Sequence, residues 1–158
     1  MLKRARRGKK IEDEQWLKMK HTEADQGDAN AMRRLAHANE KGERGLLRDV
    51  KQIRVWYERV AELDNVRSMA KFGEYLAKGQ GGPSIPVLGV LYIGRAAESG
   101  SDFATYQLGK AFMNGHYGLP QDSAKAKRYF CKVVEDRCEI KSISSAVLEK
   151  AKQYLEQL

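Results

Sequence analysis

The chain has 158 residues, 42% of them apolar, and a formal net charge of +8. This length can bury one good core, so we expect a single domain. No apolar run approaches the ~20 residues that a transmembrane helix needs, and two cysteines are too few for a disulfide scaffold.

Residues 1–10 contain most of the basic excess and no acidic side chain. They offer too little apolar surface to offset the entropy of ordering, so we predict a flexible tail, disordered or only loosely helical. Such a tail can attract the phosphates of nucleic acid or of an anionic membrane, and a merely solvated end is the alternative. The basic residues are Lys3, Arg4, Arg6, Arg7, Lys9 and Lys10.

The domain itself is expected over residues 11–158. Ile11 is followed by three acidic residues rather than by the apolar stretch of a secretory signal, and we expect an intracellular, cytoplasmic protein. Residues 11–26 predict a helix that ends before Gly27. Its residues resemble the second helix of the repeat described next, so it should cover the N-terminal end of the domain.

A first repeat is predicted over residues 28–63. Asp28 and Asp49 are suitable N-caps for two helices, and Gly42 and Gly45 between them can adopt positive φ. The apolar residues of both helices recur at helical spacing. They are Ala31, Met32, Leu35 and Ala36 in the first helix, and Ile53, Trp56, Tyr57, Val60 and Ala61 in the second.

A second repeat is predicted over residues 64–99, and its loop is unusual. Residues 79–86 contain Pro83 and Pro86 and lack an aspartate cap, which should delay the next helix to about Ile85 or later. The loop is either a tolerated variant or a segment that contacts a partner.

A third repeat, residues 100–136, is the clearest copy, with helices predicted at 104–113 and 123–134. Shifting it back by 36 residues, and then by a further 37, brings the loop glycines of all three copies into register. A helical pattern repeated at this period is typical of a stacked α-solenoid. The glycines that coincide are Gly42 and Gly45, Gly79 and Gly82, and Gly115 and Gly118.

A last helix is predicted within residues 142–158, capped by Ser142 or Ser144, and it should cover the final repeat. Before it lie Cys131 and Cys138, seven residues apart. They are either reduced, partly buried thiols or a disulfide between the last repeat and its cap, which would require an oxidising compartment.

The third repeat and its copies resemble the Sel-one-like repeat (SLR), a relative of the tetratricopeptide repeat. The resemblance covers residues 24–134, although Ala36 replaces the glycine of the first copy and Pro86 the aspartate of the second. It implies a right-handed α-α superhelix of three helix pairs with N- and C-terminal capping helices, used as a protein-interaction scaffold. The motif residues are Tyr106, Leu108, Gly109, Gly115, Gly118, Asp122, Lys125, Ala126 and Tyr129.

A partner-binding face follows from the repeat phase. If Leu35, Phe72 and Leu108 point into the stack, other residues of each first helix share a second face, which the resemblance places in the concave groove. We expect a basic band around Tyr75 that selects an acidic segment of a partner, the alternative being a solvated helix face. The residues are Arg34, His37, Lys41, Lys71, Tyr75, Lys78, Gln107, Lys110 and Asn114.

No pattern in the sequence predicts catalysis, a cofactor or a metal. The glycines at 79–82 lack the Gly-Lys-Ser/Thr of a phosphate-binding loop, and His21, His37 and His116 share no metal-ligand spacing. We therefore predict a non-enzymatic scaffold or adaptor that binds another protein. The alternatives are a nucleic-acid or ribonucleoprotein subunit that uses the basic tail, and an inhibitor or immunity partner of a toxin; the oligomeric state stays open.

Overall fold

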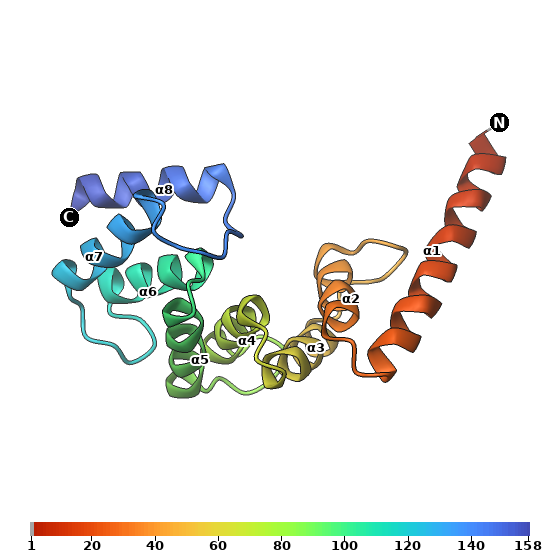
Figure 1. The fold of residues 1–158 in the computed structure, drawn as a ribbon, viewed down its shortest axis with the longest axis horizontal. Coiled ribbons are helices and arrows are strands. Elements are labelled where there is room, and N and C mark those ends of the chain that lie inside the picture. The colour runs from red at the N-terminus through yellow and green to blue at the C-terminus, as the bar shows by residue number, and fades with distance from the viewer. Residues whose placement is uncertain (1) are drawn as a thin grey trace.

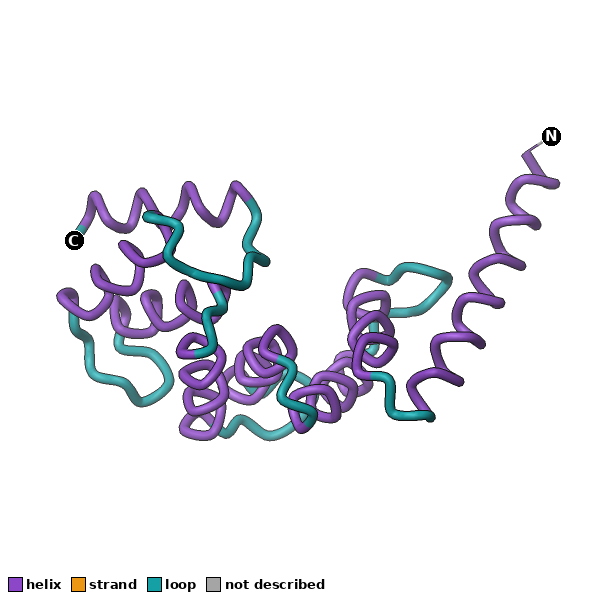
Figure 2. Tube along the Cα trace, viewed as in Figure 1, coloured by secondary structure: helices purple, strands orange, loops and turns teal. Residues whose placement is uncertain are grey.

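The structure, a computed structural model, describes residues 2–158, with side chains from Ala5 onward. The described helices follow an arc from α1 at one end to α8 at the other (Figure 1). All regular structure in this part of the chain is helical (Figure 2), which confirms an all-α helical repeat solenoid. The helices are α1 (Leu2–Asp25), α2 (Ala29–Lys41), α3 (Val50–Glu62), α4 (Val66–Lys78), α5 (Pro86–Glu98), α6 (Asp102–Asn114), α7 (Ser123–Val134) and α8 (Ser145–Gln157).

Local sequence sets most helix ends. The side chains of Asp28, Asp49 and Asp122 accept hydrogen bonds from the first backbone N–H groups of α2, α3 and α7, which would otherwise lack partners. The first helix of each pair ends at a glycine in the left-handed conformation, with φ of 65° or 66° at Gly42, Gly79 and Gly115. Ser144 caps α8, one of the two residues predicted.

The core is shared between neighbouring helix pairs, as a solenoid requires. Leu35, Phe72 and Leu108 are 1%, 3% and 6% exposed, so the predicted repeat phase is confirmed. One apolar cluster runs from α1 to the start of α6, and a second joins α6, α7 and α8 around Phe130 and Ala151. The cysteines Cys131 and Cys138 are not bonded to each other.

Glycines let the two helices of a pair approach closely at Gly73 and at Gly109. A Cβ atom on Gly73 would lie 2.6 Å from the carbonyl oxygen of Gly89, and one on Gly89 would lie 2.6 Å from that of Gly73. The backbones of α4 and α5 therefore touch. At Gly109 the neighbour is instead the ring of Phe130 in α7, which would lie 2.8 Å from a Cβ atom added to this glycine.

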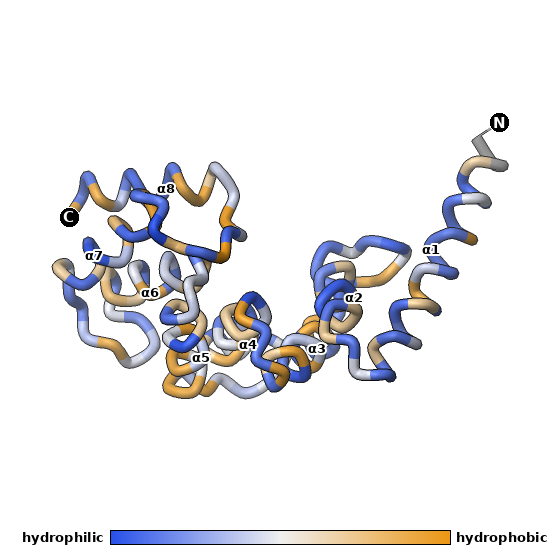
Figure 3. Tube along the Cα trace, in the orientation of Figure 1, coloured by the Kyte–Doolittle hydropathy of each residue, from blue (hydrophilic) through white to orange (hydrophobic). Residues whose placement is uncertain are grey.

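The loop 79–86 packs against α3. The guanidinium Nη1 of Arg54 donates to the carbonyl oxygen of Pro83 at 2.9 Å, and Gly81 lies against the backbone of Val50. Helix α5 begins at Pro86, and its N-cap Ile85 makes no side-chain capping bond, which confirms the predicted late start. The outer face of α5 remains apolar and exposed (Figure 3).

The N-terminal segment differs from the expected flexible tail. Helix α1 continues unbroken from Leu2 to Asp25 and projects from the body of the arc (Figure 1). Arginine and lysine are good helix formers, and Lys10 lies 3.9 Å from Glu14 one turn later, so a helix already nucleated on α2 can extend through this segment. Met1 and the side chains of Lys3 and Arg4 lie outside the described part of the chain.

None of the described helices combines the length and apolar character that crossing a membrane requires.

Candidate partner-binding groove

The inner side of the arc contains a groove with a volume of about 550 Å³. Helices α2 and α4 contribute most of its lining residues, and α3, the first turn of α6, the connection before α8 and the first turn of α8 contribute the others. It is lined by Arg33, His37, Glu40, Lys41, Tyr57, Arg67, Ser68, Lys71, Phe103, Ser142, Ile143, Ser144 and Val147.

Basic side chains dominate one wall of this groove. Arg33, Lys41, Arg67 and Lys71 face a single carboxylate, that of Glu40. Among the described residues, Lys71 alone of these four cations lies within ion-pair distance of an acidic side chain. The groove therefore carries an excess of positive charge that an acidic ligand would neutralise.

Glu40 lines the groove and joins three helices, α2, α3 and α4. Its carboxylate accepts hydrogen bonds from the hydroxyls of Tyr57 at 3.0 Å and Tyr75 at 3.3 Å, and from the ammonium of Lys71 at 3.3 Å. Burial alone would raise the pKa of Glu40, but the charge of Lys71 and these hydrogen bonds outweigh burial and hold the pKa below 4.5. Burial and the neighbouring carboxylate raise the pKa of Tyr57, and that of Tyr75 to about 12. Glu40 is thus ionised, and both tyrosines are neutral donors, at neutral pH.

The other wall is apolar and is formed by Phe103, Ile143 and Val147. The connection before α8 reaches this position because the buried carboxylate of Asp102 holds it. The backbone N–H of Ser142 donates to both oxygens of Asp102 at 2.9 Å, and the N–H of Ile143 donates at 3.2 Å. A pair of backbone hydrogen bonds between Gly100–Asp102 and Ile140 adds to this attachment.

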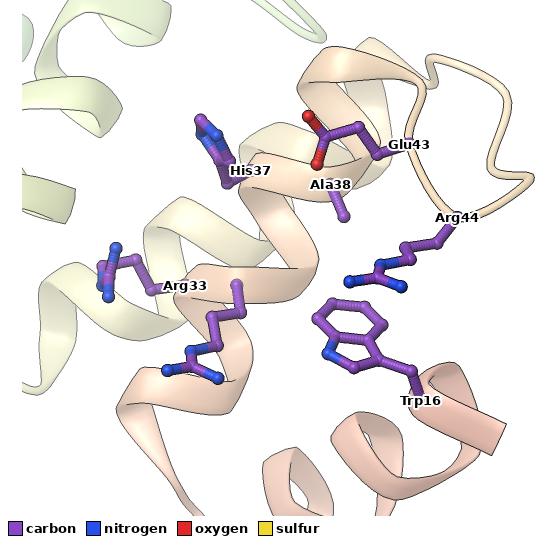
Figure 4. A pocket seen from close by; sticks show the side chains of 7 residues that line it. Trp16, Arg33, His37, Ala38, Glu43 and Arg44 are labelled. Atoms are coloured by element: carbon purple, nitrogen blue, oxygen red, sulfur yellow. The ribbon is translucent and has the colours of Figure 1, made fainter. Parts of the chain in front are cut away.

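A smaller hollow of about 130 Å³ continues the groove toward α1, because Arg33 and His37 line both. Figure 4 shows the guanidinium of Arg44 beside the indole of Trp16, 5.1 Å from the ring centroid. Arg44 also donates to Asp13 at 2.9 Å. The charge of Arg44 at this end of the groove is therefore paired with that of Asp13.

The structure brings together some of the predicted site residues. His37, Lys41 and Lys71 line the groove, and Arg34 lines the smaller hollow. The placement of Lys78 is different, because its ammonium donates a hydrogen bond to Glu74 at 2.5 Å. The predicted basic band is therefore interrupted by carboxylates at this point.

Four further predicted residues do not line the groove. Tyr75 is only 2% exposed, so its expected role as an exposed apolar anchor is wrong. Gln107 is also buried and donates to Glu74 at 3.0 Å. Lys110 lies over the ring of Tyr106, and the side chain of exposed Asn114 donates to the carbonyl oxygen of Lys110. Equivalent positions of successive repeats thus do not share one groove.

Sequence reasoning missed the residues that complete the site. The groove crosses α2 from Arg33 to its C-terminal end, the N-terminal half of α4 and the first turn of α6. Its lining residues therefore do not occupy equivalent positions in successive repeats. The spacing of Arg33, His37 and Lys41 at every fourth residue is a signal for a shared helix face. Nothing comparable in the sequence indicates that residues 142–147 face α2.

Metal-binding groupings do not occur in the part of the chain that the structure describes. No group of three or more His, Cys, Asp or Glu side chains there is arranged to hold a metal ion. The Oγ of Ser68, on the groove wall, is a buried polar atom without a hydrogen-bond partner among the described residues.

Fold and groove together define a helical repeat solenoid with a concave binding surface. Residues 29–65 and 102–133 match the Sel1 repeat family. These two segments are similar to Sel1 repeats, and proteins built from such repeats commonly act as protein-interaction scaffolds. The match leaves out α4 and α5, where Pro86 stands in place of the usual aspartate.

Two solved structures are similar to this chain. One is a Sel1 repeat protein from Oxalobacter formigenes, with 27% identity and a TM-score of 0.66, covering 90% of this chain and 98% of that one. The other is c5321, a protective antigen present in uropathogenic Escherichia coli strains and displaying an SLR fold. It has 26% identity and a TM-score of 0.65, covering 72% of this chain and 24% of the antigen. No curated protein sequence matches the chain significantly.

Proposed function

We propose that the protein is a non-enzymatic adaptor that binds an acidic segment of a partner protein in the concave groove. The observation that carries this proposal is the groove lining, where four basic side chains face one carboxylate. Coulomb attraction at a partly desolvated surface favours a ligand of opposite charge and speeds its association.

Arg33, Lys41 and Arg67 are the residues best suited to receive a partner carboxylate. Among the described side chains none of the three lies within ion-pair distance of an acid, whereas Lys71 is held by Glu40 and Glu74. Their positive charge is therefore available to a ligand without breaking an internal ion pair.

Selection from a random display library of 12-residue peptides tests the proposal. The wild type should enrich acidic peptides, and the double variant Arg33→Glu with Lys41→Glu should lose that preference. A matched control is Lys127→Glu with Arg128→Glu, which reverses two exposed charges on α7 outside the groove. Equal enrichment of acidic peptides by the wild type and the groove variant would overturn the proposal.

A second candidate function uses the projecting part of α1. Arg6, Arg7, Lys9 and Lys10 lie there, on a basic helix that projects from the body, and such a helix suits a phosphate backbone. We expect any binding to a single-stranded oligonucleotide to weaken steeply with salt and to disappear when these four residues are changed to glutamine. Retention of binding by that variant would exclude this site.

A further inference from the structure

We propose that the groove binds a two-part motif in the partner protein. The motif consists of an acidic side chain and an aliphatic side chain that lies one to four residues away in the partner sequence. This inference rests on the proposed function and adds the apolar half of the ligand. The acidic group contacts the wall of Arg33 and Arg67, and the aliphatic group contacts the wall of Phe103, Ile143 and Val147.

The two walls meet directly, which limits the distance between the two parts of the ligand. The ammonium of Lys71 lies 4.9 Å from the ring centroid of Phe103. On the other side of the junction, Nη2 of Arg67 donates to the carbonyl oxygen of Lys141 at 3.0 Å, just before the apolar wall begins. A ligand that touches both walls must carry its two groups within about one helical turn, or within a few extended residues of about 3.3 Å each.

The charged side chains of the groove also determine where the acidic group of the ligand binds. Glu40 lines the groove and accepts three hydrogen bonds there, so a second carboxylate beside it would be repelled. Neither Arg33 nor Arg67 forms an ion pair with a described carboxylate, so both favour an acidic ligand group. The motif therefore has its acid beside these arginines and an uncharged residue over Glu40.

The apolar wall exists before the ligand arrives. Asp102 is 3% exposed and holds the backbone of Ser142 and Ile143 by hydrogen bonds of 2.9 to 3.2 Å. A wall held in this way costs little conformational entropy on binding. An aliphatic side chain that covers Phe103 and Val147 would remove apolar surface from water, which contributes to affinity independently of salt.

Four synthetic peptides of ten residues test the motif on the unaltered protein. One carries glutamate and leucine three residues apart, one replaces the leucine by serine, one replaces the glutamate by glutamine, and one separates the two residues by eight positions. Fluorescence anisotropy should show that each change weakens binding by about tenfold or more. Added salt should weaken the peptides that contain glutamate and leave the remaining apolar contribution unchanged.

The variant Val147→Thr completes the experiment, because threonine keeps the branched shape of valine and replaces one of its two methyl groups by a polar hydroxyl. It should reduce the difference between the leucine and serine peptides while leaving the glutamate dependence intact. Val87→Thr, an exposed position on α5, is the matched control, and thermal melting reports on the folding of both variants.

The outcomes separate the inference from the function on which it rests. Equal affinity for the leucine and serine peptides would overturn the motif and leave an acid-binding groove. Equal affinity for the glutamate and glutamine peptides would overturn the proposed function itself. Displacement of the peptide by a 12-nucleotide single strand at similar concentration would indicate a general polyanion site and contradict the motif.

Discussion

The second and third helix pairs reach similar arrangements by different local means. In the pair α6 and α7, Asp122 caps the second helix, and Gly109 makes room for the ring of Phe130. In the pair α4 and α5, the second helix has no side-chain cap, and two glycines bring the backbones into contact. The family match covers the former pair and omits the latter.

The difference shows which features the architecture requires. A helix pair tolerates the loss of an aspartate cap when a loop is fastened elsewhere, here by Arg54 and Pro83. It is less tolerant of added bulk where its two helices cross, because the close-packed interior leaves little space into which a neighbouring group can shift. Packing at the crossing is therefore the stricter constraint, and four sets of measurements test this ranking.

Truncation of the core should have the largest effect and should be similar in both pairs. Leu108→Ala in α6 removes a side chain that is 6% exposed and should lower the free energy of unfolding by roughly 2 to 5 kcal/mol. Its counterpart Phe72→Ala in α4 should cost about 3 to 5 kcal/mol. Urea denaturation measures both, and a loss below about 0.5 kcal/mol for either would contradict the shared repeat phase.

Alanine substitutions at the helix crossings should lower the stability of the protein by different amounts in the two pairs. In Gly89→Ala the new Cβ would lie 2.6 Å from the oxygen of Gly73 and 2.7 Å from the nitrogen of Ala77, so the backbones must part, at about 2 to 3 kcal/mol. In Gly109→Ala the neighbour is the ring of Phe130, which can move, and the gain in helix propensity of roughly 0.5 to 1 kcal/mol offsets part of the cost. Equal losses of melting temperature would show that the α4–α5 contact is no tighter.

Installing the missing cap should stabilise α5. Ile85→Asp places a carboxylate at an N-cap position that is 42% exposed, where it can accept from the free N–H groups of the first turn. We expect a gain of about 0.5 to 1 kcal/mol. Ile85→Ala is the control that removes the isoleucine without adding a cap, and a gain of the same size in that control would point to relief of exposed apolar surface instead.

Lowering the pH should weaken the N-terminal cap of α7 and leave the first turn of α5 unchanged, because α5 has no carboxylate cap. This is the smallest of the four effects. The backbone N–H of Lys125 donates to Asp122 and holds the pKa of this carboxyl below its ordinary 3.8. A lowered pKa means that the cap contributes fully above about 3.8 and is lost as the pH falls through the lower folded value. In an NMR titration from about pH 5 to about pH 2.5, the amide of Lys125 should shift and that of Gly89 should not. Parallel shifts at both amides would indicate general acid unfolding.

Much of the fold was predictable because it depends on interactions between neighbours in the chain. The spacing of Leu35, Phe72 and Leu108 determined the buried face, and the glycines after α2, α4 and α6 determined where those helices end. The late start of α5 followed from Pro86 itself. A continuous helix over residues 2–10 was not predicted, because it depends on the extension of a helix already packed against α2.

The binding groove was predictable only in part. The sequence by itself determined that His37, Lys41 and Lys71 lie on the inner side of the first helices. The tertiary structure alone decided that Tyr75 is buried beneath Glu40, because a tyrosine at a helix surface is exposed or covered according to what the neighbouring helix places over it. It also decided that residues 142–147 form the apolar wall, since this contact depends on Asp102, 40 residues earlier in the chain than Ser142. Local spacing carries no signal for hydrogen bonds over such separations.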